Sequence, residues 1–343
     1  FTVGYDTVTS TDETQIAARH ALALGLDHTI VTVSAHEVGA NYASVTSARD
    51  EPVADIAGPS YMALAQAFRS AGVPVLLSGQ GGDELFWGYP WVRTAALMYV
   101  EERAPVIAKP GEYLRSLMHS RGMFAEGMRS LGGTRTHHLL KTLLEAADSG
   151  ATAVPLFAAS PGFPRLLKRS RQLIKSAPCG APVLRFPIAT RNPGIFAIGI
   201  MQTYLRTNGL TQLDRLSMRW SVEARTPFVD YKLVEYVVGN QGHKVLTLRE
   251  GKEGLQRAAQ RLAPQLPGVG RKQGFTPPIR KWMSEIWRHE RRSFGDLALA
   301  TTGLFDRRKL YDSISRPVSR YGEVDALAFR LLTLELWWRD LSV

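Results

Sequence analysis

The first eighty residues alternate between short apolar runs and longer segments whose apolar residues recur at helical spacing. Runs rich in β-branched or apolar residues at 1–4, 28–33 and 73–77 predict three strands. The segments between them predict helices, with caps at 11–13 and at Ser34 and a further helix over 61–71. The run at 73–77 shows no alternation, as expected of a strand buried on both faces. This order predicts an α/β fold with a doubly wound parallel sheet.

The remainder of the chain has a helical pattern without evident strands. Residues 95–200 are helical but irregular, with several Pro and Gly breaks, and 201–343 are mostly helical. No run of eighteen apolar residues occurs, so the sequence predicts no membrane span.

The charge and the cysteine content restrict the classes of function that the sequence supports. The chain has 42 basic and 31 acidic residues, a formal charge of +11, but the basic residues are scattered, and the densest basic cluster, at 288–292, is short and has no aromatic-interleaved basic stripe. We therefore interpret them as solvated surface and expect no nucleic-acid partner. The single cysteine, Cys179, excludes an internal disulfide and is typical of a reducing, cytoplasmic setting. No histidine lies beside it in sequence, so we expect no catalytic thiol.

A glycine-rich segment follows the buried strand directly. Gly79, Gly81 and Gly82 allow a phosphate to approach the backbone closely, and ligands of open parallel sheets bind beyond the carboxyl ends of strands. Asp83 and Glu84 come next and offer the hard oxygen ligands that Mg²⁺ prefers. The segment therefore predicts a nucleotide site.

Several segments in a fixed order along the chain carry a resemblance to a known family. The segment SGQGGDELFWGY at 78–89 resembles the ATP-site motif SGxGxDExFxGY of asparagine synthetases. Segments 1–4 and 50–52 resemble the family's adenine-pocket strand and an acidic turn. The family's DRxSM and ExRxPFLD segments have counterparts within 213–230. Its catalytic-lysine helix resembles 251–264, and its final KxGFxxPxxxW motif resembles 272–282. The chain is therefore similar to the ATP-dependent synthetase domain of that family.

The resemblance implies an ATP-dependent, amide-forming ligase with an adenine nucleotide α-hydrolase-like fold. Such an enzyme adenylates a carboxylate, releases pyrophosphate and lets ammonia attack the acyl-adenylate, using ATP and Mg²⁺. It implies a nucleotide-binding part at 1–94 that is incomplete at its N-terminus, a helical insertion at 95–200, and a helical part at 201–343 that completes the site. Lys252 and Gln80 are the expected catalytic residues and Asp83 the expected metal ligand. The expected ATP-binding residues are Val3, Gly4, Ser78, Gly79, Gly81, Gly82 and Lys272.

Several departures from the family's pattern bear on the substrate. Gln80 stands where the family usually has a carboxylate, and an amide can orient a substrate but cannot act as a general base. No motif places a cation for the carboxylate of aspartate, and Gln256 stands where Arg is frequent. The pairs Glu223–Arg225 and Asp214–Arg215 serve either as bracing ion pairs or as substrate contacts, and we treat both as scaffold first.

The family's SGGxDS loop is missing from the sequence, and so is its glutaminase domain. We expect a glutaminase domain or subunit upstream, and we expect that residues 1–343 alone do not turn over ATP. Three interpretations stay open: an asparagine synthetase; a relative that acts on another small-molecule or peptide carboxylate, as in lasso-peptide, β-lactam or glycan tailoring; and a non-catalytic remnant. The sequence also leaves open whether the protein is a monomer or a homodimer.

Overall fold

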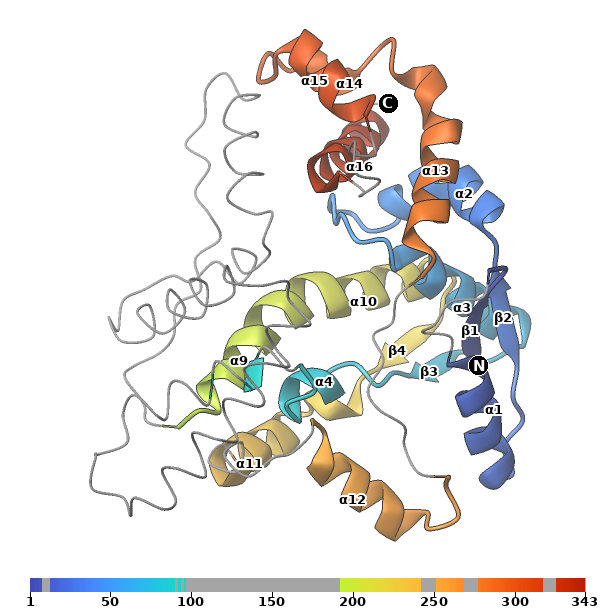
Figure 1. The fold of residues 1–343 in the computed structure, drawn as a ribbon, viewed down its shortest axis with the longest axis vertical. Helices are drawn as coiled ribbons and strands as arrows, with labels where there is room; N and C mark the ends of the chain where they lie inside the picture. Colours follow the sequence, from blue (N-terminus) through green and yellow to red (C-terminus); the bar gives the residue numbers. More distant parts are fainter. Residues whose placement is uncertain are drawn as a thin grey trace.

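The structure, a computed structural model, describes residues 1–7, 13–89, 92, 93, 96, 192–241, 251–267, 277–316 and 325–342 (Figure 1). Its fold is mixed α/β and mostly helical, with short parallel strands. The predicted helical segment at 95–200 lies outside the described residues apart from 96 and 192–200.

All pairing between the described strands is parallel, as the sequence predicts. Strand β1 (Thr2–Tyr5) pairs with β2 (Ile30–Val33), and β3 (Val75–Leu77) pairs with β4 (Glu223–Arg225). Within the described residues these strands form two separate two-stranded sheets, so a single doubly wound sheet stays a prediction. Strand β4 was not predicted, because three residues are too short for a recognisable alternation.

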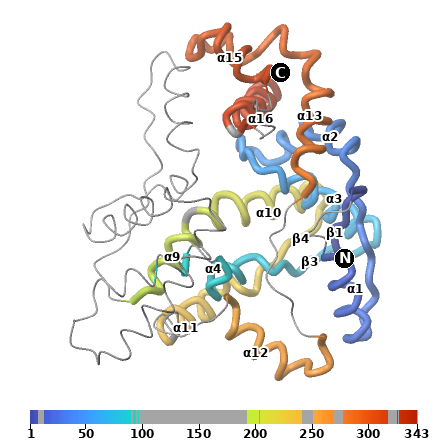
Figure 2. Tube along the Cα trace, in the orientation of Figure 1, coloured from blue at the N-terminus to red at the C-terminus, as the bar shows by residue number. Residues whose placement is uncertain are grey.

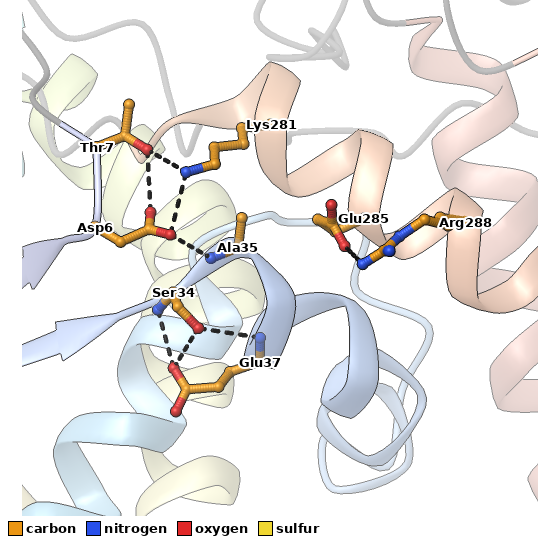
Figure 3. Close-up of polar contacts among 8 residues, drawn as sticks. All are labelled: Asp6, Thr7, Ser34, Ala35, Glu37, Lys281, Glu285 and Arg288. Carbon is orange, nitrogen blue, oxygen red and sulfur yellow. Dashed lines mark hydrogen bonds and ion pairs between the residues drawn. The ribbon is translucent and has the colours of Figure 1, made fainter.

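The helices of the N-terminal part lie close to their predicted positions. They are α1 (Thr14–Ala23), α2 (Ala35–Ser47), α3 (Gly58–Ser70) and the short α4 (Gly82–Leu85). Ser34 caps α2 as expected: its hydroxyl accepts a hydrogen bond from the Glu37 backbone N–H, and the Glu37 carboxylate accepts one from the Ser34 backbone N–H (Figure 3). The predicted cap residues 11 and 12 of α1 lie outside the described residues, and Glu13 makes no side-chain cap.

The C-terminal part is mostly helical, as predicted. A continuous helical segment runs through α9 (Ile195–Ile200), a π-helix (Met201–Leu210) and α10 (Thr211–Met218). The other helical elements are η3 (Pro227–Val229), α11 (Tyr231–Gln241), α12 (Glu253–Leu262), α13 (Ile279–Glu290), η5 (Arg291–Ser293), α14 (Ala298–Thr301), α15 (Arg307–Ile314) and α16 (Ala326–Leu341). No helix among the described residues is long and apolar enough to cross a membrane.

The largest apolar core joins the two ends of the chain. Helix α2 packs against α13 and α16, which lie beside it in Figures 1 and 2. The hydroxyls of Tyr42 and Thr333 lie 3.0 Å apart in this core, and both side chains are fully buried. At Gly39 a Cβ would lie 2.8 Å from the Glu285 carbonyl oxygen, so only glycine allows this approach of α2 to α13. Lys281 of α13 also pairs with Asp6, which follows β1, at 3.1 Å (Figure 3).

A smaller core supports the end of β3. Buried Leu76, Leu213 and Val222 pack together there with the partly buried side chains of Tyr61, Phe68, Trp220 and Ala224. Because α3, α10 and β4 all contribute, the carboxyl end of β3 and the loop after it are held by three elements.

Candidate active site

The glycine-rich loop after β3 is a tight turn that packs on η3. The Gly82 backbone N–H donates to the Gly79 carbonyl at 3.1 Å, and Gly81 has a φ of 92°, a left-handed conformation that favours glycine. A Cβ at Gly81 would lie 2.6 Å from a Val229 methyl group, whereas a Cβ at Gly79 would meet no described atom within 4 Å. Gly81 is therefore required for packing, while Gly79 leaves open space beside the backbone.

Lys252 and Asp83 meet at this loop. The Lys252 Nζ lies 3.0 Å from Asp83 Oδ1, and the two side chains are 30% and 27% exposed. The backbone N–H of Lys252 also donates to the Phe86 carbonyl at 2.8 Å. The structure thus brings together the predicted catalytic lysine and the predicted metal ligand, although neither role is tested by this contact.

Lys252 has a φ of 65°, which is uncommon for a residue other than glycine. It is the N-cap of α12, and its side chain makes no capping hydrogen bond. Strained backbone of this kind is found disproportionately at functional sites, where surrounding contacts maintain it. Here the Phe86 hydrogen bond and the ion pair with Asp83 maintain it.

Glu84 has a structural environment that differs from that of Asp83. Its side chain is buried and accepts a hydrogen bond of 2.8 Å from the Tyr89 hydroxyl. Burial, together with the nearby Glu84 charge, raises the pKa of Tyr89, so the hydroxyl stays protonated and continues to donate. The Glu84 carboxylate is therefore occupied by a hydrogen bond within the protein. Of the two neighbouring carboxylates, Asp83 is the accessible one.

Gln80 is held by a residue that the sequence did not single out. Its Nε2 donates to the Tyr61 hydroxyl of α3 at 2.7 Å. Burial raises the pKa of Tyr61, and the negative charge of Asp55 adds to the effect. The contact joins residues nineteen positions apart on different elements, so no local sequence pattern could have indicated it.

The structure places the remaining predicted residues as follows. Gly4 of β1 packs tightly, since a Cβ there would lie 3.1 Å from an Ile30 methyl group and 3.2 Å from one of Thr14. Val3 packs against the large core, and Ser78 donates its backbone N–H to the Arg225 carbonyl at 2.8 Å. Lys272 lies outside the described residues, so its predicted phosphate role stays a prediction.

The two charged pairs treated as scaffold do form ion pairs. Glu223 and Arg225 lie 2.9 Å apart, and Arg215 lies 3.2 Å from Asp50 and 3.9 Å from Asp214. The Glu223–Arg225 pair is not buried: both side chains are more than half exposed, and both residues belong to strand β4.

Comparison with known proteins agrees with these motifs. The profile of the family described as asparagine synthase matches residues 1–339. The chain belongs to the asparagine synthase family. This asparagine synthase domain is 30% identical over 298 residues to asparagine synthetase [glutamine-hydrolyzing] 1 of Bacillus subtilis, covering 82% of the chain and 43% of that protein.

Two further relatives show the breadth of the family. A putative asparagine synthetase [glutamine-hydrolyzing] of Mycobacterium tuberculosis is 30% identical over 296 residues, covering 82% of the chain and 41% of that protein. A fungal protein named amidase chyE, from Penicillium rubens, is 25% identical over 248 residues, covering 69% and 36% respectively. The domain thus spans less than half the length of these relatives. No solved structure matches the chain.

Proposed function

We propose that this domain is the synthetase part of an ATP-dependent amide-forming ligase, in which a carboxylate is adenylated and then attacked by ammonia or an amine. The observation that carries the proposal is the 3.0 Å contact between Lys252 and Asp83 at the glycine-rich loop. It supplies a cation and an anion at the carboxyl end of a parallel strand, where nucleotides bind in open α/β sheets. Family membership supports the use of ATP.

The described residues of this loop supply groups that fit an adenylation site. Open space beside Gly79 leaves room for a phosphate to approach the backbone. Lys252 carries an ammonium that can neutralise charge as pyrophosphate departs. Because Asp83 holds this ammonium before the nucleotide binds, the lysine starts within reach of the same loop.

A magnesium ion fits Asp83 as a single protein ligand. The described residues contain no group of three or more His, Cys, Asp or Glu side chains suited to a metal, but Mg²⁺ commonly binds through one or two carboxylates together with substrate phosphates and water. Asp83 would hold the ion, which when bound supplies positive charge to the phosphates. Glu84 is buried against Tyr89 and is not needed for this.

The glutamine at position 80, Gln80, supports a second candidate function with the same chemistry. This candidate is a tailoring ligase that acts on a carboxylate other than aspartate. An amide that donates to Tyr61 cannot accept a proton from the attacking amine, so this site requires a nucleophile that arrives deprotonated or is deprotonated elsewhere. The amidase name of the Penicillium relative is consistent with varied acceptors among homologues. For either candidate we propose a glutaminase domain or subunit as one source of ammonia.

The proposal is tested by ATP–pyrophosphate exchange with the full-length protein, Mg²⁺ and a panel of carboxylates. Aspartate-dependent exchange supports an asparagine synthetase, and exchange with another carboxylate alone supports the tailoring ligase. Absence of exchange and of AMP formation across the panel, in a protein that is folded by circular dichroism, would contradict both and support the non-catalytic remnant.

A further inference from the structure

The buried side chain of Arg93 lies against the backbone that follows the glycine-rich loop. The residue is 9% exposed, and its Nη1 donates a hydrogen bond to the Trp87 carbonyl at 2.8 Å. Burying a charged guanidinium costs free energy unless the protein supplies partners for it. The presence of an arginine here therefore indicates a role that an apolar residue of similar size could not fill.

The Trp87–Gly88 turn that Arg93 contacts has a strained conformation. Trp87 has a φ of 59°, which is uncommon for a residue other than glycine, and it is buried. The Gly88 backbone N–H donates to the Asp83 carbonyl at 2.7 Å, and a Cβ at Gly88 would overlap Asp83 Oδ1. The turn therefore lies directly on the Asp83 side chain. The hydrogen bond from Arg93 is one of the contacts that maintain this conformation.

Gly251, the residue before Lys252, packs on the same turn and on the guanidinium. A Cβ at Gly251 would overlap Arg93 Nη1 and would lie 2.5 Å from the Trp87 carbonyl oxygen. Only glycine lets the chain approach the turn so closely. The Arg93 guanidinium therefore contacts the segment that carries Lys252 as well as the turn beside it.

We propose that Arg93 is a positioning residue for Lys252. By donating to the Trp87 carbonyl and filling the space beside Gly251, the guanidinium keeps the Lys252 ammonium 3.0 Å from Asp83 Oδ1. Without it, the carbonyl loses a donor and the segment that carries the lysine moves. A misplacement of about 1 Å can cost a reaction about 100-fold in rate. The effect on catalysis rests on the proposed function, in which Lys252 neutralises charge as pyrophosphate departs.

The position of Lys252 is measured without turnover, by its rate of acetylation with sulfosuccinimidyl acetate in the full-length protein, read by peptide mass spectrometry. An amine held against a carboxylate reacts slowly, because it must leave the pair to attack the reagent. Arg93→Met accelerates acetylation of Lys252 about threefold, the scale of a partly exposed ion pair, and matches the rate in Asp83→Asn. Acetylation of Lys232, an exposed lysine on α11, does not change.

Further variants separate this contact from a general loss of charge or of folding. Arg69→Met removes an exposed arginine at the end of α3 and keeps the wild-type rate. Arg93→Lys keeps a donor for the Trp87 carbonyl and restores slow acetylation. If Arg93→Met does not fold, as judged by circular dichroism, Gly251→Ala disturbs the same contact from its other side and releases Lys252 equally. Unchanged Lys252 acetylation in a folded Arg93→Met or Gly251→Ala protein would overturn the proposal.

ATP–pyrophosphate exchange in the full-length protein then shows whether Arg93 acts through Lys252. Arg93→Met lowers the kcat of exchange about tenfold and leaves the KM for ATP within about twofold. The double variant Arg93→Met/Lys252→Met is no slower than Lys252→Met, because the positioned group is already gone. Losses that multiply in the double variant would mean that Arg93 acts independently of Lys252, and would overturn the proposal. Accelerated acetylation in a protein without exchange contradicts the proposed function alone, whereas exchange with unchanged acetylation contradicts the positioning role alone.

Discussion

The side-chain amide of Gln80 donates to the hydroxyl of Tyr61 at 2.7 Å, at the point where the glycine-rich loop meets α3. Gln80 lies in the loop and is a site residue predicted from the sequence. Tyr61 lies on the helix and is not predicted as one. Because burial raises the pKa of Tyr61, this hydroxyl stays protonated at neutral pH. Neither member of the pair is therefore a base as it stands.

Replacing Gln80 by Glu tests what the lack of a base in this pair means for amide formation. The new carboxylate accepts a hydrogen bond from Tyr61 and can take a proton from an attacking amine. We expect the pH profile of amide formation by Gln80→Glu to gain an acidic limb that the wild type lacks. Gln80→Leu serves as the control, since it removes the hydrogen bond without adding a charge. Identical pH profiles for wild type and Gln80→Glu would contradict a role for residue 80 in the second step.

Removing either member of the Lys252–Asp83 pair should abolish adenylation. We expect Lys252→Met and Asp83→Asn each to reduce ATP–pyrophosphate exchange in the full-length protein at least 100-fold, the scale of losing a group that stabilises transition-state charge. Lys232→Met, an exposed lysine on α11, should leave exchange within about twofold. A Lys252→Met enzyme with near-normal exchange would show that the contact in the structure is only structural.

The backbone strain at Lys252 predicts that two inactive variants differ in their free energy of unfolding. Lys252→Gly and Lys252→Ala both remove the ammonium, but only glycine adopts a φ of 65° without a steric cost. We expect Lys252→Gly to be more stable than Lys252→Ala by about 1 kcal/mol in urea unfolding, with both inactive. Equal stabilities would mean that the loop relaxes once the lysine is gone.

The cap of α2 predicts a pH-dependent contribution to stability. Hydrogen bonds from the Ser34 hydroxyl and backbone N–H lower the pKa of Glu37 below its ordinary 4.5 (Figure 3). The stabilisation is therefore present above pH 4.5 and is lost as the pH falls through the folded-state pKa. Ser34→Ala should cost about 1 kcal/mol of unfolding free energy at pH 7 and less at acid pH. Ser70→Ala, at the exposed end of α3, is the control.

Patterns among neighbouring residues of the sequence predicted the helices and strands whose positions depend on those neighbouring residues. Ser34 predicted the start of α2, and the apolar run at 73–77 predicted β3 and its parallel pairing. Burial of this strand on both faces was wrong, because Leu77 is exposed. The motifs also predicted Asp83 and Lys252 as site residues, and the structure places their charged groups 3.0 Å apart.

Contacts between distant segments were beyond the reach of these patterns. Strand β4 exists because β3 offers it hydrogen bonds, and a hydrogen-bonded network of Asp55, Asn208 and Gln212 depends on a π-helix that no residue spacing marks. The pairing of Glu223 with Arg225 follows from their spacing, but their exposure depends on where β4 lies. In each case the determining partner is far away in the chain.

The core between α2 and the C-terminal helices also has a consequence for synthesis of the protein. Tyr42 and Thr333, which meet in that core, are 291 positions apart, so α2 emerges from the ribosome long before α13 and α16 can cover it. Contacts of such sequence separation slow folding and leave early-made apolar surface exposed. Nascent chains that stop short of α13 should therefore depend on chaperones and be degraded readily, whereas completed chains should not.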